Sequence, residues 1–215
     1  LDANTTGSFN TGLGLQALTE NTTADSNTAL GYKVLHTNTT GTTNTAAGRN
    51  AMLNNTTGSQ NVAVGAFALD ANSTANNNTA VGYNALTTNT TGTENTALGR
   101  QALKFNETGG SNVAIGVNTL LNNTASNNTG VGNGSLTANT TGAQNTAVGV
   151  NSLDANTTAN ANTAIGFGCL GANTTGATNS GLGSNTLENN TTGSSNTALG
   201  HNALTNNTTA SNNTA

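Results

Sequence analysis

The chain of 215 residues contains 42 Asn, 45 Thr and 27 Gly, lacks proline and tryptophan, and has a net charge of −4. Its four cations, Lys33, Arg49, Arg100 and Lys104, form no run, so the charge pattern argues against a nucleic-acid partner. No apolar stretch approaches the roughly 18 residues of a membrane span. We therefore expect no nucleic-acid binding and no membrane insertion in this segment.

A 17-residue unit, Asn-Thr-Ala-Val-Gly-x-x-Ala-Leu-x-x-Asn-Thr-Thr-Gly-x-x, repeats along the whole chain. Coils begin at residues 10, 27, 44, 61, 78, 95, 112, 128, 145, 162, 179 and 196, with partial coils at 1–9 and 213–215. The one step of 16 falls where Asn123-Thr124-Ala125 shortens a corner. A short fixed period indicates a solenoid. The sequence predicts an all-β, parallel β-solenoid (β-roll) of about twelve coils, a single array over 1–215 that we expect to be a segment of a longer fibre.

The coil that begins at Asn78 illustrates the expected local structure. Alternation over 78–82 predicts a short strand with Thr79 and Val81 on one face and Ala80 on the other, and we expect Val81 to point inward. Residues 84–86 predict a second short strand with Leu86 inward and Ala85 outward. The segment 89–92 predicts a turn, because Asn caps its own backbone and Gly accepts positive φ.

Two apolar columns are the candidate core. The aliphatic column occupies the fourth place of each coil and includes Val64, Val81, Leu98 and Ile115. The leucine column occupies the ninth place and includes Leu69, Leu86 and Leu103. With about two large apolar side chains per coil, we expect a thin file of stacked aliphatic groups.

Two further columns consist wholly of asparagine. The opening column includes Asn27, Asn44, Asn61, Asn78 and Asn95, and the corner column includes Asn38, Asn55, Asn72 and Asn89. We expect both to form structural ladders of stacked amides. Most corner asparagines also fit Asn-x-Thr, so Asn38, Asn89 and Asn173 are candidate glycan acceptors, although we favour the interpretation that the same residues simply make the turn.

The third place of each coil is restricted to Ala or Gly, for example Ala80 and Gly181. We expect this alanine column to face outward, where its small residues suggest that another backbone packs against it, as in a homotrimer. The alternative is that Ala fits a tight bend before Gly.

The units Asn61-Val62-Ala63-Val64-Gly65 and Asn112-Val113-Ala114-Ile115-Gly116 resemble the repeats of YadA-like trimeric autotransporter adhesin heads. The longer phrase from Asn78 to Gly92 is similar to repeats of bacterial surface proteins and of phage-type tail fibres that carry a C-terminal chaperone domain. The resemblance covers the whole chain. It implies a left-handed, trimeric β-roll exposed outside a cell or on a virion surface.

No residues form a recognisable catalytic, cofactor or metal site, and we expect no enzyme. Asp70, Asp154 and Glu188 share one column but lie coils apart, and His36 and His201 have no partner in sequence. Cys169 stands in a column of small residues, where an inert thiol is favoured over an interchain disulfide.

Three functions stay open. The first is a structural shaft or filament segment of an extracellular fibre, whose partners are further copies of the chain. The second is an adhesin head that binds a host or cell-surface glycan through aromatics, which are Tyr32, Tyr83, Phe67, Phe105 and Phe167. The third is an ice-binding solenoid, because the threonines of the corners, such as Thr40, Thr57 and Thr91, are similar to the threonine arrays of that class. Their place at a corner rather than on a flat sheet argues against it.

Overall fold

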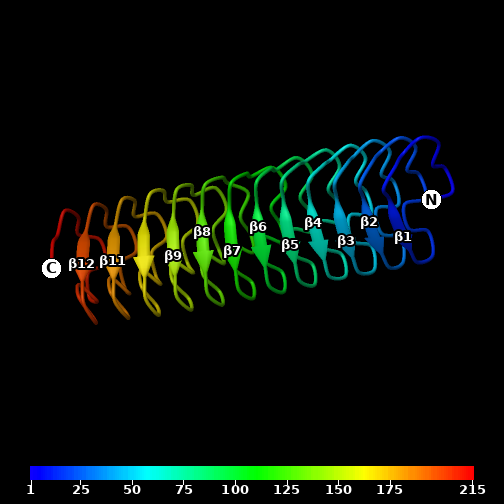
Figure 1. Cartoon of the computed structure of the whole chain (residues 1–215). Coiled ribbons are helices and arrows are strands. Elements are labelled where there is room, and N and C mark those ends of the chain that lie inside the picture. The colour runs from blue at the N-terminus through cyan, green and yellow to red at the C-terminus, as the bar shows by residue number, and fades with distance from the viewer. The chain divides into compact units, whose positions relative to one another are not determined.

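A computed structural model describes residues 1–215 and shows an all-β chain with twelve parallel strands of three residues each and no helix (Figure 1). It divides into two compact units, Leu1–Ser111 and Asn112–Ala215. The first unit contains β1 (Thr11–Leu13), β2 (Thr28–Leu30), β3 (Thr45–Ala47), β4 (Val62–Val64), β5 (Thr79–Val81) and β6 (Thr96–Leu98). The second contains β7 (Val113–Ile115), β8 (Thr129–Val131), β9 (Thr146–Val148), β10 (Thr163–Ile165), β11 (Ser180–Leu182) and β12 (Thr197–Leu199). The predicted β-solenoid is confirmed.

Within each unit, neighbouring strands pair in register, each with the equivalent strand of the next coil. In the first unit Thr79 pairs with Thr96 and Ala80 with Ala97. The 16-residue step in the second unit leaves this register intact, because Val113 still pairs with Thr129. The missing residue lies in the corner at 123–125, where a loop absorbs it without moving the strands.

The predicted second strand at 84–86 is wrong, because residues 83–88 form turns. Asn84 and Leu86 have φ of 55° and 51°, in the left-handed region, and every coil repeats this pair of positive φ values. A strand sends neighbouring side chains to opposite faces. The turns instead allow Ala85 and Leu86 to be buried together, so the expectation that Ala85 points outward is also wrong.

The strand face that is buried is the opposite of the one that we predicted. The alanine column is buried, including Ala80, whereas the aliphatic column lies on the outer face. Val64 is 39% exposed, Leu98 46% and Ile115 37%, and Val81 is partly exposed, so these four core predictions are wrong. The reason is the thinness of the coil: buried leucines from the turn side fill the interior and leave room only for a methyl group on the strand side. Leu69, Leu86 and Leu103 are fully buried, which confirms the leucine column as core.

The corner asparagines form the predicted amide ladder. Asn55 Nδ2 donates to Asn38 Oδ1 at 2.7 Å and to the Gly58 carbonyl at 2.9 Å. Its own Oδ1 accepts from Asn72 Nδ2 at 2.7 Å. Each amide therefore closes its own corner and ties that corner to the adjacent coils, which satisfies polar atoms that are fully buried.

The opening asparagines are linked differently. Asn61 Oδ1 accepts the backbone N–H of Asn78 at 2.9 Å, and Asn61 Nδ2 donates to the Ala75 carbonyl at 2.9 Å. The same pattern recurs at Asn27, Asn44 and Asn78. This column is mainly a series of side-chain to backbone bonds, not of stacked amides, and it holds each strand at its start.

The glycan interpretation does not fit the folded chain. Asn38, Asn89 and Asn173 are fully buried, and the Nδ2 atom that would carry a glycan makes two hydrogen bonds in each case. A sugar on any of these atoms would replace one of the two N–H hydrogens, break at least one of these bonds and find no space between the stacked coils. The turn interpretation, which we favoured, accounts for these residues.

Candidate functional site

The outer face of the strands is the most distinctive surface of each unit. We call it the sheet face; it consists of the aliphatic column and of the strand-threonine column, which is the second residue of each coil. In the first unit it contains Thr11, Thr28, Thr45, Val62, Thr79 and Thr96 beside Leu13, Leu30, Ala47, Val64, Val81 and Leu98. In the second it contains Val113, Thr129, Thr146, Thr163, Ser180 and Thr197 beside Ile115, Val131, Val148, Ile165, Leu182 and Leu199.

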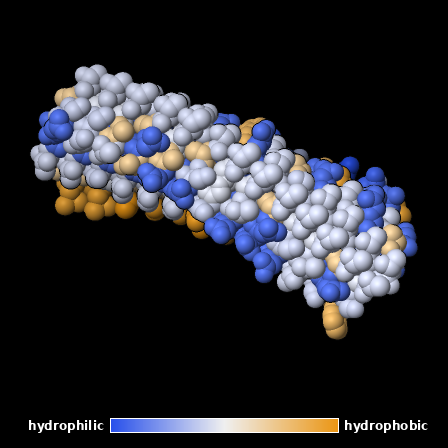
Figure 2. Space-filling model, turned by 90° about the horizontal axis from the view of Figure 1, so that it is seen from above, coloured by the Kyte–Doolittle hydropathy of each residue, from blue (hydrophilic) through white to orange (hydrophobic).

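Exposed aliphatic side chains run along this face without a charged residue among them. Figure 2 shows apolar side chains gathered in a row along one edge of the surface, at the C-terminal end of the chain. Leu182 is 47% exposed, and its neighbours Ile165 and Leu199 are also exposed. Apolar surface arranged in a continuous row, unlike single scattered residues, is typical of a contact surface.

Between β10 and β12 the sheet face is hollowed into a shallow apolar groove of about 290 Å³. Ile165, Leu182 and Leu199 form one side, and Thr163, Ser180 and Thr197 form the other. Its floor includes Gly181 and Ala198 of the alanine column. The groove lies between the two outer rows because the middle residue of each strand points into the coil and leaves only its backbone on this face.

The aromatic residues of the first unit do not form a repeated site. Phe67 and Tyr83 meet edge to face with ring centroids 6.2 Å apart. Cations from the same unit cover three rings: Lys33 Nζ lies 5.6 Å from the Tyr32 centroid, Arg49 Cζ 5.4 Å from that of Phe67, and Lys104 Nζ 4.6 Å from that of Phe105. These contacts are local cation–π pairs. Phe167, in the second unit, has none of this kind.

The remaining candidate side chains are dispersed, with two exceptions that sequence reasoning missed. His36 Nδ1 lies 3.8 Å from Glu20 Oε1 of the preceding coil, so the two form an ion pair when His36 is protonated. Asp154 and Glu188 line the same hollow on the turn side of the second unit. The glycine at 171 that separates them in their column is the sequence signal that could have indicated this hollow.

Cys169 is a free, fully buried thiol whose pKa burial raises to about 11. Its burial is inconsistent with an interchain disulfide in the folded chain and agrees with the favoured inert thiol. No group of three or more His, Cys, Asp or Glu side chains is arranged to hold a metal ion. The chain forms no helix with the length and apolar character that a membrane crossing requires.

The sequence matches no family model and no curated protein, and the fold matches no solved structure.

Proposed function

We propose that this chain is a structural segment of an extracellular fibre whose copies associate through the sheet face. The observation that carries the proposal is the uncharged row of exposed aliphatic side chains on regularly spaced strands. Burial of a Leu or Ile side chain contributes about 1.5–3 kcal/mol relative to exposure. Such a contribution matters for a chain whose interior has few large apolar side chains, mainly stacked leucine and alanine between buried asparagines.

A second copy of the chain is the occupant that fits this face best. Its columns repeat at every coil, so two copies aligned in parallel can match row to row along each unit. No charged group would lose water on contact, so the interface would not carry the cost of desolvating a charge. The alanine column no longer supports the trimer, because it lies inside the coil. A trimer is the stoichiometry that the resemblance to adhesin heads implies, and the extracellular location has the same basis.

The experiment is a mass measurement by light scattering on the full chain. The test variant combines Ile165→Lys and Leu182→Lys on the sheet face, and the matched control combines Thr175→Lys and Thr192→Lys at exposed corners of the same coils. We expect a trimeric mass for the natural chain and the control, and a monomeric mass for the test variant. A natural chain that stays monomeric at high concentration would overturn the proposal.

Ice binding is a second candidate, because the strand threonines form a solvent-facing row on the parallel sheet rather than only at corners. In the second unit Thr129, Thr146 and Thr163 occupy consecutive strands. The aliphatic column beside them varies in size from Val131 to Leu182, so the second row of this face is uneven. An uneven row fits a protein partner, whose side chains can repack, better than it fits the regular lattice of ice. Thermal hysteresis of the purified chain at the concentration where it is monomeric tests this; clear activity would favour ice binding over self-association.

A further inference from the structure

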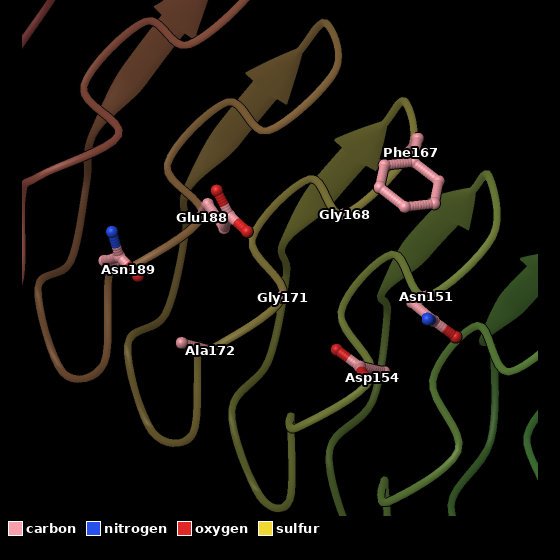
Figure 3. Close-up of a pocket in the computed structure, with 8 residues that line it drawn as sticks. All are labelled: Asn151, Asp154, Phe167, Gly168, Gly171, Ala172, Glu188 and Asn189. Carbon is pink, nitrogen blue, oxygen red and sulfur yellow. The ribbon is translucent and has the colours of Figure 1, made fainter.

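The coil 162–178 lacks two outer side chains that its neighbours have. Gly168 and Gly171 occupy columns that in the adjacent coils carry Asn and acidic residues respectively: Asn151 and Asn185 in the first, Asp154 and Glu188 in the second. The result is a hollow of about 360 Å³ on the turn side of the second unit, which we call the notch (Figure 3). Asn151, Asp154, Phe167, Glu188 and Asn189 line it around the two glycines.

The fold does not require these glycines. Gly168 has a φ of 61°, but Asn151 and Asn185 adopt 54° in the same column with full side chains, and a Cβ on Gly168 would meet Asn185 Oδ1 at 2.8 Å, at the end of a flexible side chain. Gly171 has no positive φ, and a Cβ there would lie 3.2 Å from the Gly168 carbonyl oxygen and 3.4 Å from Asp154 Oδ1, a tight but tolerable fit. The two missing side chains therefore open a space that the coil geometry would otherwise fill.

The notch collects all the acidic residues of its unit. Asp154 and Glu188 are the only carboxylates in residues 112–215, a stretch that contains no Lys or Arg. They come from the coils on either side of the glycine coil and flank it in Figure 3. Both are partly buried, and burial raises the pKa of Asp154. The negative charge of this site has no cation from its own unit to balance it.

Phe167 is the only aromatic residue of the second unit, and it lines the same notch. Its side chain is 57% exposed. The rings of Tyr32, Phe67 and Phe105 each carry a cation from their own unit, whereas no Lys or Arg is available to Phe167. Its ring face is thus open to a cation brought by a ligand.

We propose that the notch binds the ammonium group of a small hydroxylated organic cation, such as an amino sugar. Glu188 and Asp154 balance the ammonium charge, the Phe167 ring contributes a cation–π contact, and the amide of Asn189 reaches a ligand hydroxyl group. The inference does not depend on the proposed self-association, because the notch lies on the turn side of the coil and the sheet face on the strand side.

Calorimetric titration of the full chain with glucosamine, choline, glucose and calcium tests the assignment. We expect saturable, millimolar binding of glucosamine and binding of glucose at least about tenfold weaker, since glucose lacks the charge. Choline binding alone would also support a cation site and would identify quaternary ammonium compounds as its ligands. Equal affinity for glucose and glucosamine, or no binding of either ammonium compound, would overturn the proposal.

Four variants locate the site. Glu188→Gln removes charge, Phe167→Val introduces the residue found in that column at Val150, and Gly171→Thr introduces the residue found at Thr137. Each should weaken glucosamine binding about tenfold or more without changing the thermal midpoint by circular dichroism. Glu94→Gln, in the first unit, removes an exposed carboxylate outside the notch and should leave binding unchanged. Calcium binding that displaces glucosamine and survives Phe167→Val would show a metal site instead and would refute the cation–π assignment.

Discussion

Gly181 lies so close to Cys169 that a Cβ on Gly181 would stand 2.6 Å from the Cys169 Sγ atom. Gly130 has the same relationship to Thr119, whose Cγ2 would lie 2.7 Å from such a Cβ. In several coils both columns hold alanine, for example Ala68 and Ala80, so a methyl group faces a methyl group across the interior. At Cys169 and Thr119 the turn side has a larger side chain and the next strand has glycine, which shows how narrow the space is at these two places.

We predict that Gly181→Ala destabilises the chain by about 1–3 kcal/mol, the usual effect of overpacking a filled interior. Cys169→Ala in the same chain should restore most of this loss, because it recreates the pair of methyl groups found in other coils. Urea unfolding of both single variants and the double variant measures the coupling. Additive effects would contradict a direct contact between the two residues.

The sequence predicted the solenoid because a 17-residue period leaves few alternatives, and it predicted the leucine column because Leu69 and its equivalents hardly vary. It could not say which strand face lies inside. The alternation places Ala80 and Val81 on opposite faces of the strand but does not tell which face is buried. The assumption that the larger side chain is buried fails in a coil this thin. The deciding contact joins Gly181 and Cys169, which are distant in the repeat and close only across the interior.

The contact surfaces were hidden from sequence reasoning for related reasons. With Val64 assigned to the core, the sheet face could not be recognised as a candidate interface. Asp154 and Glu188 belong to different coils, and only the structure shows that Gly171 between them in the column leaves a hollow that both side chains line. The sequence could predict that the two asparagine columns make hydrogen bonds, since a buried amide must satisfy its polar atoms. It could not predict which atoms each amide binds, because these depend on the geometry of the corner.

The corner ladder should be sensitive to the loss of one amide. Asn55→Ala leaves the Gly58 carbonyl, Asn38 Oδ1 and Asn72 Nδ2 each short of a buried hydrogen bond. We expect a loss of about 2 kcal/mol or more, since three hydrogen bonds worth about 0.5–1.5 kcal/mol each disappear and the buried Asn38 Oδ1 loses its donor, whereas the Gly58 carbonyl and Asn72 Nδ2 each keep a second partner. Thr57→Ala, at an exposed position of the same corner, is the control and should change the urea midpoint little. Equal effects of the two substitutions would contradict a stabilising role for the ladder.

The stability of the first unit should depend on the charge of Asp70. Burial raises the pKa of this carboxyl above its ordinary value of 3.8, and its Oδ1 atom has no hydrogen-bond partner. Between the unfolded and the folded pKa the native state binds more protons, so this group lowers stability as the pH rises through that window. Above the folded pKa the penalty is complete, and below pH 3.8 it is absent.

Asp70→Asn should therefore stabilise the chain at neutral pH, by less than about 1 kcal/mol because the side chain is partly exposed to solvent. The gain should vanish in acid. Thermal midpoints measured across this pH range check the prediction, with Glu107→Gln as the control at an exposed carboxylate. A gain of equal size at acid and neutral pH would exclude the charge of Asp70 as its cause.

The thiol of Cys169 should react only when its coil opens. It is fully buried, and its pKa of about 11 leaves almost no thiolate at neutral pH. We expect no reaction with a disulfide reagent in the native chain and stoichiometric reaction in denaturant. Reaction at the rate of a free thiol under native conditions would show that this coil is open in solution.

Positive φ at non-glycine residues is a cost that single substitutions can relieve. Gln101 has a φ of 61° and a partly exposed side chain, whose one hydrogen bond is to Arg100 Nη1 at the surface. Left-handed backbone costs roughly 1–2 kcal/mol for an L-residue and nothing for glycine, although glycine also gains entropy in the unfolded chain. Gln101→Gly should thus be neutral or stabilising by up to about 1 kcal/mol, as Gly134 and Gly168 in the same column indicate. Gln101→Ile should destabilise the chain by about 1–2 kcal/mol, because β-branched side chains fit this region worst. The urea midpoint of Gln101→Gly should equal or exceed that of the natural chain, and the midpoint of Gln101→Ile should lie below it. A higher midpoint for isoleucine than for glycine would contradict the left-handed backbone at this position.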